Sequence, residues 1–129
     1  LEMQAQEEFG HAMKFYGYVH DRGGEVELQA LPAPQKSWKS SMAAFQDVLK
    51  HEQKVTGLIN DLCALADAEK DNASRVLLNW FVDEQVEEEA SAQAVVDKCK
   101  MLENHPGGDY LLDKEMSGRS AAAASGEGH

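Results

Sequence analysis

Proline, cysteine and basic side chains are all scarce in this chain, and each shortage narrows what the protein can be. Three prolines in 129 residues, with abundant Glu, Ala, Lys, Gln and Leu, favour helix over sheet. The two cysteines, Cys63 and Cys99, stand far apart without the spacing of a zinc site or a disulfide framework. We therefore expect a mainly helical, cytoplasmic protein with free thiols.

Basic residues are also too few to balance the acids. The 23 Asp and Glu outnumber the 12 Lys and Arg, so the formal net charge is −11. Such a field repels phosphate backbones and attracts cations, which argues against a nucleic-acid partner. Apolar runs stay short of the roughly 18 residues that a membrane span needs, and no signal-peptide pattern opens the sequence. We expect no membrane partner.

Apolar side chains recur at helical spacing in several segments. A serine cap at Ser40 or Ser41 and paired glycines at Gly23-Gly24 mark helix boundaries. We predict helices over residues 1–21, 41–68, 72–104 and 109–117. The proline-containing stretch from Gly23 to about Lys39 is predicted to be an extended crossover. We assign residues 1–117 to one helical domain and residues 118–129 to a disordered tail or linker.

The predicted architecture is an all-α bundle. Residues 72–104 follow the preceding helix after a short polar turn, and such a connection favours antiparallel neighbours. The chain opens at Leu1 as if already inside a helix, with no capping residue before it. Three long helices with broad apolar stripes usually require a fourth. We therefore expect that an N-terminal helix is missing from this sequence.

Five acids crowd the segment DEQVEEE, Asp83–Glu89, directly after the apolar LLNWFV. At about 100° per residue, helical phase decides which acids face the core. The phase places three acids on one face with apolar side chains: Glu84, Glu87 and Glu88 with Leu77, Trp80, Phe81 and Val95. Asp83 and Glu89 point elsewhere, and we interpret them as solvated.

The other two long helices also direct acids inward. Glu52 interrupts the apolar stripe of residues 41–68, and Glu8 lies in phase with the stripe of residues 1–21. Glu7 and His11 lie at the edge of that stripe. Because an uncompensated buried carboxylate costs several kcal/mol, such a cluster requires cations. Several carboxylates with one imidazole suit iron or manganese better than structural zinc or calcium.

The segments AQEEFGH, KHEQ, NWFVDEQVEEE and GGDYLLDKE occur in this order, with a long crossover before KHEQ. In this combination the chain resembles bacterial non-haem ferritin over roughly residues 3–117. Bacterioferritin and rubrerythrin are similar, but they carry a second Glu-x-x-His on the last long helix, where this sequence has none. The resemblance implies a ferritin-like four-helix bundle with a long crossover and a short C-terminal helix, here without the first helix. It also implies assembly of 24 subunits into an iron-storage cage.

The resemblance implies roles for eight residues. Glu8 would bridge two irons, His11 would bind the first iron, and Glu52 and Glu88 would bind the second. Gln85 would form hydrogen bonds beside the pair. The residues that resemble an additional, third iron site are Glu7, Glu84, Glu87 and Glu88. The family's first helix carries a further iron-ligating Glu and a nearby Tyr, which this sequence does not contain.

Three functions follow from these expectations. The first is a ferroxidase that oxidises Fe(II) with dioxygen and stores ferric mineral in the cage. The alternative is a catalytically impaired or inactive shell protein that retains assembly surfaces and partial metal binding. A monomeric metal-binding bundle is the third.

Overall fold

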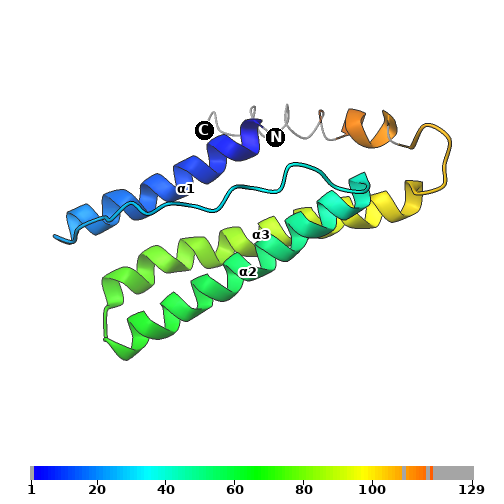
Figure 1. Cartoon of the computed structure of the whole chain (residues 1–129). Coiled ribbons are helices and arrows are strands. Elements are labelled where there is room, and N and C mark those ends of the chain that lie inside the picture. The colour runs from blue at the N-terminus through cyan, green and yellow to red at the C-terminus, as the bar shows by residue number, and fades with distance from the viewer. Residues whose placement is uncertain (1, 109, 116, 118–129) are drawn as a thin grey trace. The chain divides into compact units, whose positions relative to one another are not determined.

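A computed structural model describes residues 2–108, 110–115 and 117. These residues include three long helices and no strand. The helices are α1 (Glu2–Asp21), α2 (Ser41–Ala68) and α3 (Asn72–Leu102), as Figure 1 shows. Residues 108, 110–115 and 117 are also helical, in agreement with the predicted short helix, although its expected cap Asp109 lies outside the described residues. The predicted tail, residues 118–129, lies outside them as well.

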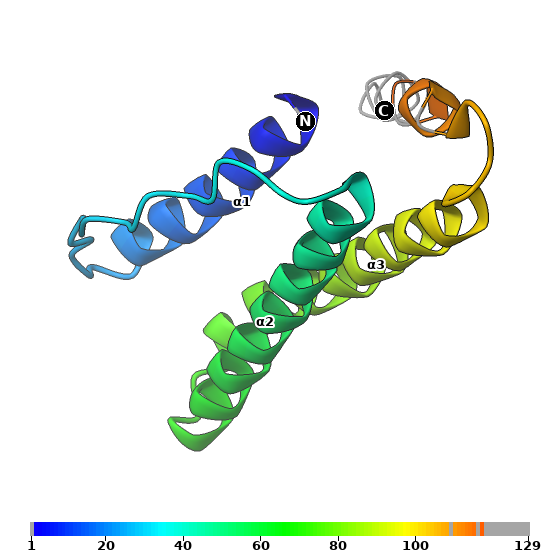
Figure 2. The same ribbon diagram turned by 45° about the vertical axis from the view of Figure 1, so that its right-hand side comes forward.

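The described residues divide into two compact units, one with residues 2–35, 114, 115 and 117 and one with residues 36–108 and 110–113. The second unit contains α2 and α3, which run antiparallel and contact each other along their length (Figures 1 and 2). Their shared core consists of apolar residues from both helices: Ile59, Cys63, Ala66, Leu78, Phe81, Val95, Val96 and Cys99. Burying a large apolar side chain contributes roughly 1.5–3 kcal/mol, so this seam stabilises the hairpin.

The N-terminus of α2 is fixed by the predicted serine cap. The side chain of Ser40 accepts a hydrogen bond from the backbone N–H of Ala43 at 3.1 Å. This bond satisfies one of the donors left unpaired in the first turn of a helix. The prediction that the helix begins at Ser40 or Ser41 is confirmed.

Lys70 ends α2 in a left-handed conformation, with φ of 55°. Its N–H donates to Asp67 O, and the N–H of Asp71 donates to Ala66 O at 2.8 Å. This pair of bonds closes the helix end, and glycine is the residue that usually occupies the left-handed position. The side chain of Asp71 then caps α3, because its Oδ1 accepts from Ser74 N at 3.1 Å. The turn between the two helices is therefore only three residues long.

In the first unit, the predicted glycine stop ends α1. Gly23 has φ of 78°, and the N–H of Gly24 donates to Val19 O at 2.8 Å. A Cβ at Gly24 would lie 2.9 Å from Val19 Cγ1, so a larger residue would not fit this turn without displacing its neighbour. After it, the chain reverses direction and continues without regular secondary structure, as predicted for the crossover (Figure 1).

One predicted helix boundary needs correction. The third helix ends at Leu102, two residues earlier than Asn104, because the N–H of His105 folds back to Leu102 O at 3.0 Å. The helices of the described part of the chain contain no segment that is both long enough and apolar enough to cross a membrane.

Candidate metal centre

Glu52 and Glu88 face each other across the α2–α3 hairpin. One carboxylate oxygen of Glu52 and one of Glu88 lie within 4.8 Å of each other, and two unit charges at that separation repel by about 3.5 kcal/mol at an effective dielectric constant of about 20. Glu52 is buried, with 4% of its surface exposed, and Glu88 is half-buried. A cation between the two groups would convert this repulsion into attraction.

The burial of Glu52 confirms the predicted inward phase of this residue. The other buried side chains of its helix, Ile59, Cys63 and Ala66, lie two to four turns further on, so Glu52 is the polar member of an otherwise apolar stripe. The sequence places a carboxylate where the packing would favour an apolar side chain. Such a departure from the pattern is expected at a functional site.

Gln85 holds the Glu52 carboxylate from the opposite helix. Its side-chain nitrogen Nε2 donates to Glu52 Oε2 at 3.3 Å and to the backbone oxygen of Glu52 at 3.1 Å. Gln85 is itself buried, with 7% exposed. A buried amide that donates to a carboxylate orients that carboxylate and partly satisfies it in the absence of a cation.

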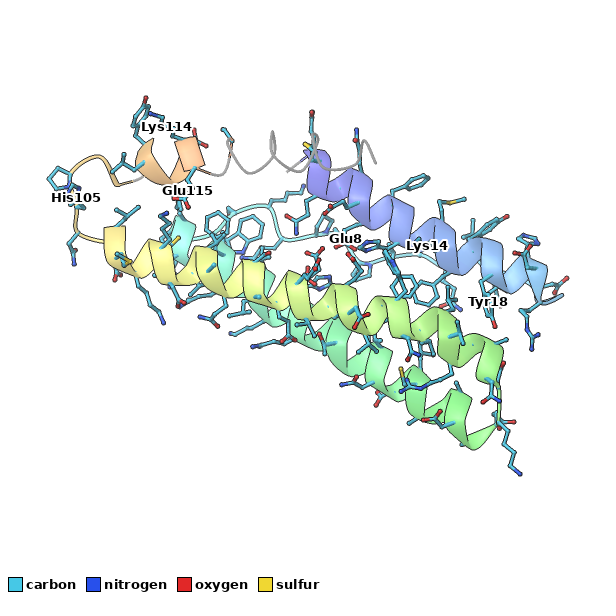
Figure 3. All side chains as sticks on the ribbon, turned by 180° about the vertical axis from the view of Figure 1, so that it is seen from behind. Glu8, Lys14, Tyr18, His105, Lys114 and Glu115 are labelled. Atoms are coloured by element: carbon cyan, nitrogen blue, oxygen red, sulfur yellow. The ribbon has the colours of Figure 1, made fainter. Side chains whose placement is uncertain are left out.

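In the first unit, α1 carries its own pair of metal-ligating residue types. His11 Nδ1 and Glu8 Oε2 lie 3.7 Å apart, with 18% of the histidine side chain and 52% of the glutamate side chain exposed. Figure 3 labels Glu8 together with Lys14 and Tyr18 on the same helix. The i, i+3 spacing places carboxylate and imidazole on one helix face, where both can bind the same cation.

The remaining predicted ligands are all more exposed than Glu52. Glu84 is half-buried on α3, whereas Glu87 and, on α1, Glu7 are exposed. Their assignment to a third iron site stays a prediction. Of the two acids interpreted as solvated, Asp83 is exposed, but Glu89 is half-buried.

The predicted inward face of α3 is displaced from the observed one. Phe81 and Val95 are buried as predicted, but Leu78 and Gln85 are buried in place of the predicted Leu77 and Trp80. Trp80 is 37% exposed and packs its ring edge-on against Phe81, with centroids 4.9 Å apart. The phase analysis missed Gln85 because it centred the inward face on Leu77 and Trp80, although the spacing of Gln85 from Phe81 and Glu88 fits the observed stripe.

An antiparallel helical hairpin with facing carboxylates and a helix that carries Glu-x-x-His are features of ferritin-like helical bundles, which hold metals with carboxylate and imidazole ligands. Comparison with known proteins narrows this class to one family. Residues 1–102 match the family described as ferritin-like domain. The chain belongs to the ferritin family, as its sequence pattern suggested.

Bacterial relatives support the assignment. The chain is 40% identical over 117 residues to a bacterial non-heme ferritin of Staphylococcus haemolyticus, covering 91% of this chain and 70% of the relative. It is 41% identical over 117 residues to the bacterial non-heme ferritin of Staphylococcus saprophyticus, with the same coverage.

Solved archaeal ferritins share the fold. An open-pore ferritin of Archaeoglobus fulgidus superposes with a TM-score of 0.86 at 46% identity, over 88% of this chain and 70% of that one. A form of the Archaeoglobus fulgidus ferritin engineered to be closed gives a TM-score of 0.86 at 45% identity, over 89% of this chain and 70% of that one. The predicted all-α, ferritin-like fold class is confirmed.

Proposed function

We propose that this chain is a ferritin subunit that binds Fe(II), oxidises it with dioxygen and stores the ferric product in a protein cage. The observation that carries the proposal is the Glu52–Glu88 pair, with oxygens within 4.8 Å across the hairpin and Glu52 held by buried Gln85. Membership of the ferritin family supports iron as the cation. The net charge of −11 favours the approach of Fe(II).

The resemblance to the ferritin pattern implies further iron ligands on α1. Glu8 would bridge two irons, His11 would bind the first, and Glu52 and Glu88 would bind the second. Carboxylates suit this role because hard anionic oxygens stabilise Fe(III) relative to Fe(II), and imidazole is a common iron ligand. What supports the proposal for α1 is the 3.7 Å separation of Glu8 and His11 and the resemblance to the ferritin pattern.

The redox balance requires two irons for each oxidant molecule. Two Fe(II) ions give up one electron each, and dioxygen takes both electrons with two protons to form hydrogen peroxide. The side chains of the chain supply ligands and orientation, and they are not themselves oxidised. Glu7, Glu84, Glu87 and Glu88 would bind a third iron beside the pair.

Storage requires assembly, and we propose a homo-oligomeric cage of 24 subunits in the cytoplasm. The support is at the level of the family, in which solved relatives include open-pore and closed forms. Cys63 and Cys99 are buried and are not joined in a disulfide, which suits a reducing compartment. Light scattering coupled to size-exclusion chromatography measures the particle mass and tests the subunit number.

Aerobic Fe(II) oxidation, followed by ferric absorbance, tests the activity. The double variant Glu52→Gln, Glu88→Gln keeps side-chain volume and removes two charges. The matched control Asp61→Asn, Asp83→Asn removes two charges from exposed positions of the same two helices. We expect the first variant to lose most of the catalysed rate and the control to retain it. Iron binding by a large particle without catalysed oxidation would instead favour the inactive shell protein.

A further inference from the structure

The hydroxyl of Thr56 lies within the hydrogen-bond network that surrounds the Glu52 carboxylate. Thr56 is one turn beyond Glu52 on α2, and its Oγ1 donates to the backbone oxygen of Glu52 at 3.1 Å. A threonine hydroxyl has a single proton. Because that proton is used in this bond, the same oxygen can only accept hydrogen bonds from other groups.

Gln85 from α3 supplies the donor that this oxygen accepts. The distance from Gln85 Nε2 to Thr56 Oγ1 is 3.1 Å, equal to its distance from the backbone oxygen of Glu52. The third acceptor, Glu52 Oε2, lies at 3.3 Å. Three oxygens of α2 therefore surround one amide nitrogen of α3.

This arrangement determines which way the Gln85 amide faces. If the amide were reversed, its carbonyl oxygen would lie against a carboxylate, a backbone carbonyl and a hydroxyl whose proton is already committed. The carboxylate and the backbone carbonyl could not donate to it, and the hydroxyl could do so only by giving up its bond to the backbone oxygen of Glu52, so the reversed amide would cost a hydrogen bond. Thr56 thus gives the Gln85 amide a neutral acceptor in addition to the two oxygens of Glu52. This acceptor lies one turn after Glu52 on α2.

We propose that Thr56 is a positioning residue for metal binding. Its hydroxyl fixes the orientation of Gln85, and Gln85 in turn orients Glu52 toward the cation. This inference rests on the proposed function, because it requires Glu52 to be a metal ligand. Thr56 itself does not contact the metal and acts through Gln85.

The test uses Co(II) as a probe whose absorption spectrum reports ligand geometry without oxidation chemistry. Thr56→Val keeps the branched shape and removes the hydroxyl, whereas Thr56→Ser keeps the hydroxyl. Groups that orient metal ligands typically change affinity by roughly 10–100-fold when removed, so we expect Thr56→Val to weaken Co(II) binding about tenfold. Thr56→Ser should restore parental affinity and the parental spectrum.

A double-mutant cycle with Gln85→Met separates positioning from general packing. If Thr56 acts through Gln85, adding Thr56→Val to Gln85→Met should cause no further loss of affinity. An additive loss, or failure of Thr56→Ser to restore binding, would overturn the positioning role. So would parental Co(II) binding by Thr56→Val.

Failure of the underlying function gives a different result. In that case the parent protein would not bind Co(II), or Glu52→Gln, Glu88→Gln would bind it as tightly as the parent does. Either outcome overturns both proposals. Loss of binding in that double variant with unchanged binding in Thr56→Val overturns the role of Thr56 alone.

Discussion

The Nε2 atom of Gln85 lies 3.3 Å from Oε2 of Glu52, and both side chains are buried in the α2–α3 hairpin. The bond joins residues 33 positions apart in the sequence. The amide N–H stabilises the negative charge of the Glu52 carboxylate, which also faces Glu88 in the proposed iron site.

Gln85→Glu should destabilise the metal-free protein. The substitution replaces the donor with a third carboxylate beside Glu52 and Glu88, and we expect a loss of roughly 2–3 kcal/mol in the free energy of unfolding from the added repulsion. Urea denaturation with and without Mn(II) measures the effect, and the metal should offset part of it. Gln46→Glu adds the same charge at an exposed position of α2 and should change stability by less than about 0.5 kcal/mol. Equal stability of the two variants would contradict this account of the contact.

His11→Gln should slow Fe(II) oxidation. If His11 binds the first iron, removal of its imidazole leaves that iron one ligand short while the Glu52–Glu88 pair remains. We expect the rate to fall at least about tenfold, as it typically does when residues around a metal are altered. Oxygen consumption measures this rate. His20→Gln changes an exposed histidine of the same helix and should leave the rate unchanged. If both variants oxidise iron at the parental rate, His11 is not a ligand.

Lys70→Gly should stabilise the hairpin. Lys70 has φ of 55°, a conformation that glycine adopts without the steric penalty of a side chain. We expect the free energy of unfolding to rise by about 1 kcal/mol, measured by chemical denaturation. Lys50→Gly provides the opposite control, because Lys50 is exposed within α2 and glycine costs about 1 kcal/mol in a helix interior. A destabilised Lys70→Gly variant would show that the side chain of Lys70 contributes more than its backbone conformation costs.

Helix boundaries were predictable because local chemistry determines them. Ser40 caps α2 through its own side chain, and Gly23-Gly24 end α1 through a left-handed turn, so short sequence signals suffice. The left-handed Lys70 was not predictable in the same way, since lysine carries no preference for that conformation. There the short connection between α2 and α3 imposes the geometry.

The candidate site was predictable only in part. Glu52 breaks a clean apolar stripe, so its inward position follows from phase. Leu77 and Leu78 are consecutive near the start of α3 and are followed closely by Trp80 and Phe81, so phase alone did not separate Leu78 from Leu77. Gln85 entered through resemblance, because its burial depends on acceptors from the other helix. The approach of Glu52 to Glu88 depends on how α2 and α3 are aligned along each other. The sequence pattern of either helix alone does not contain this alignment.

Anaerobic titration of the protein with Fe(II) in a calorimeter tests the central claim most directly. If Glu52 and Glu88 bind iron, the parent and the Asp61→Asn, Asp83→Asn control should show the same high-affinity binding. Glu52→Gln, Glu88→Gln should lose at least one bound Fe(II) per chain. Undiminished high-affinity binding by that double variant would contradict the assignment of the site.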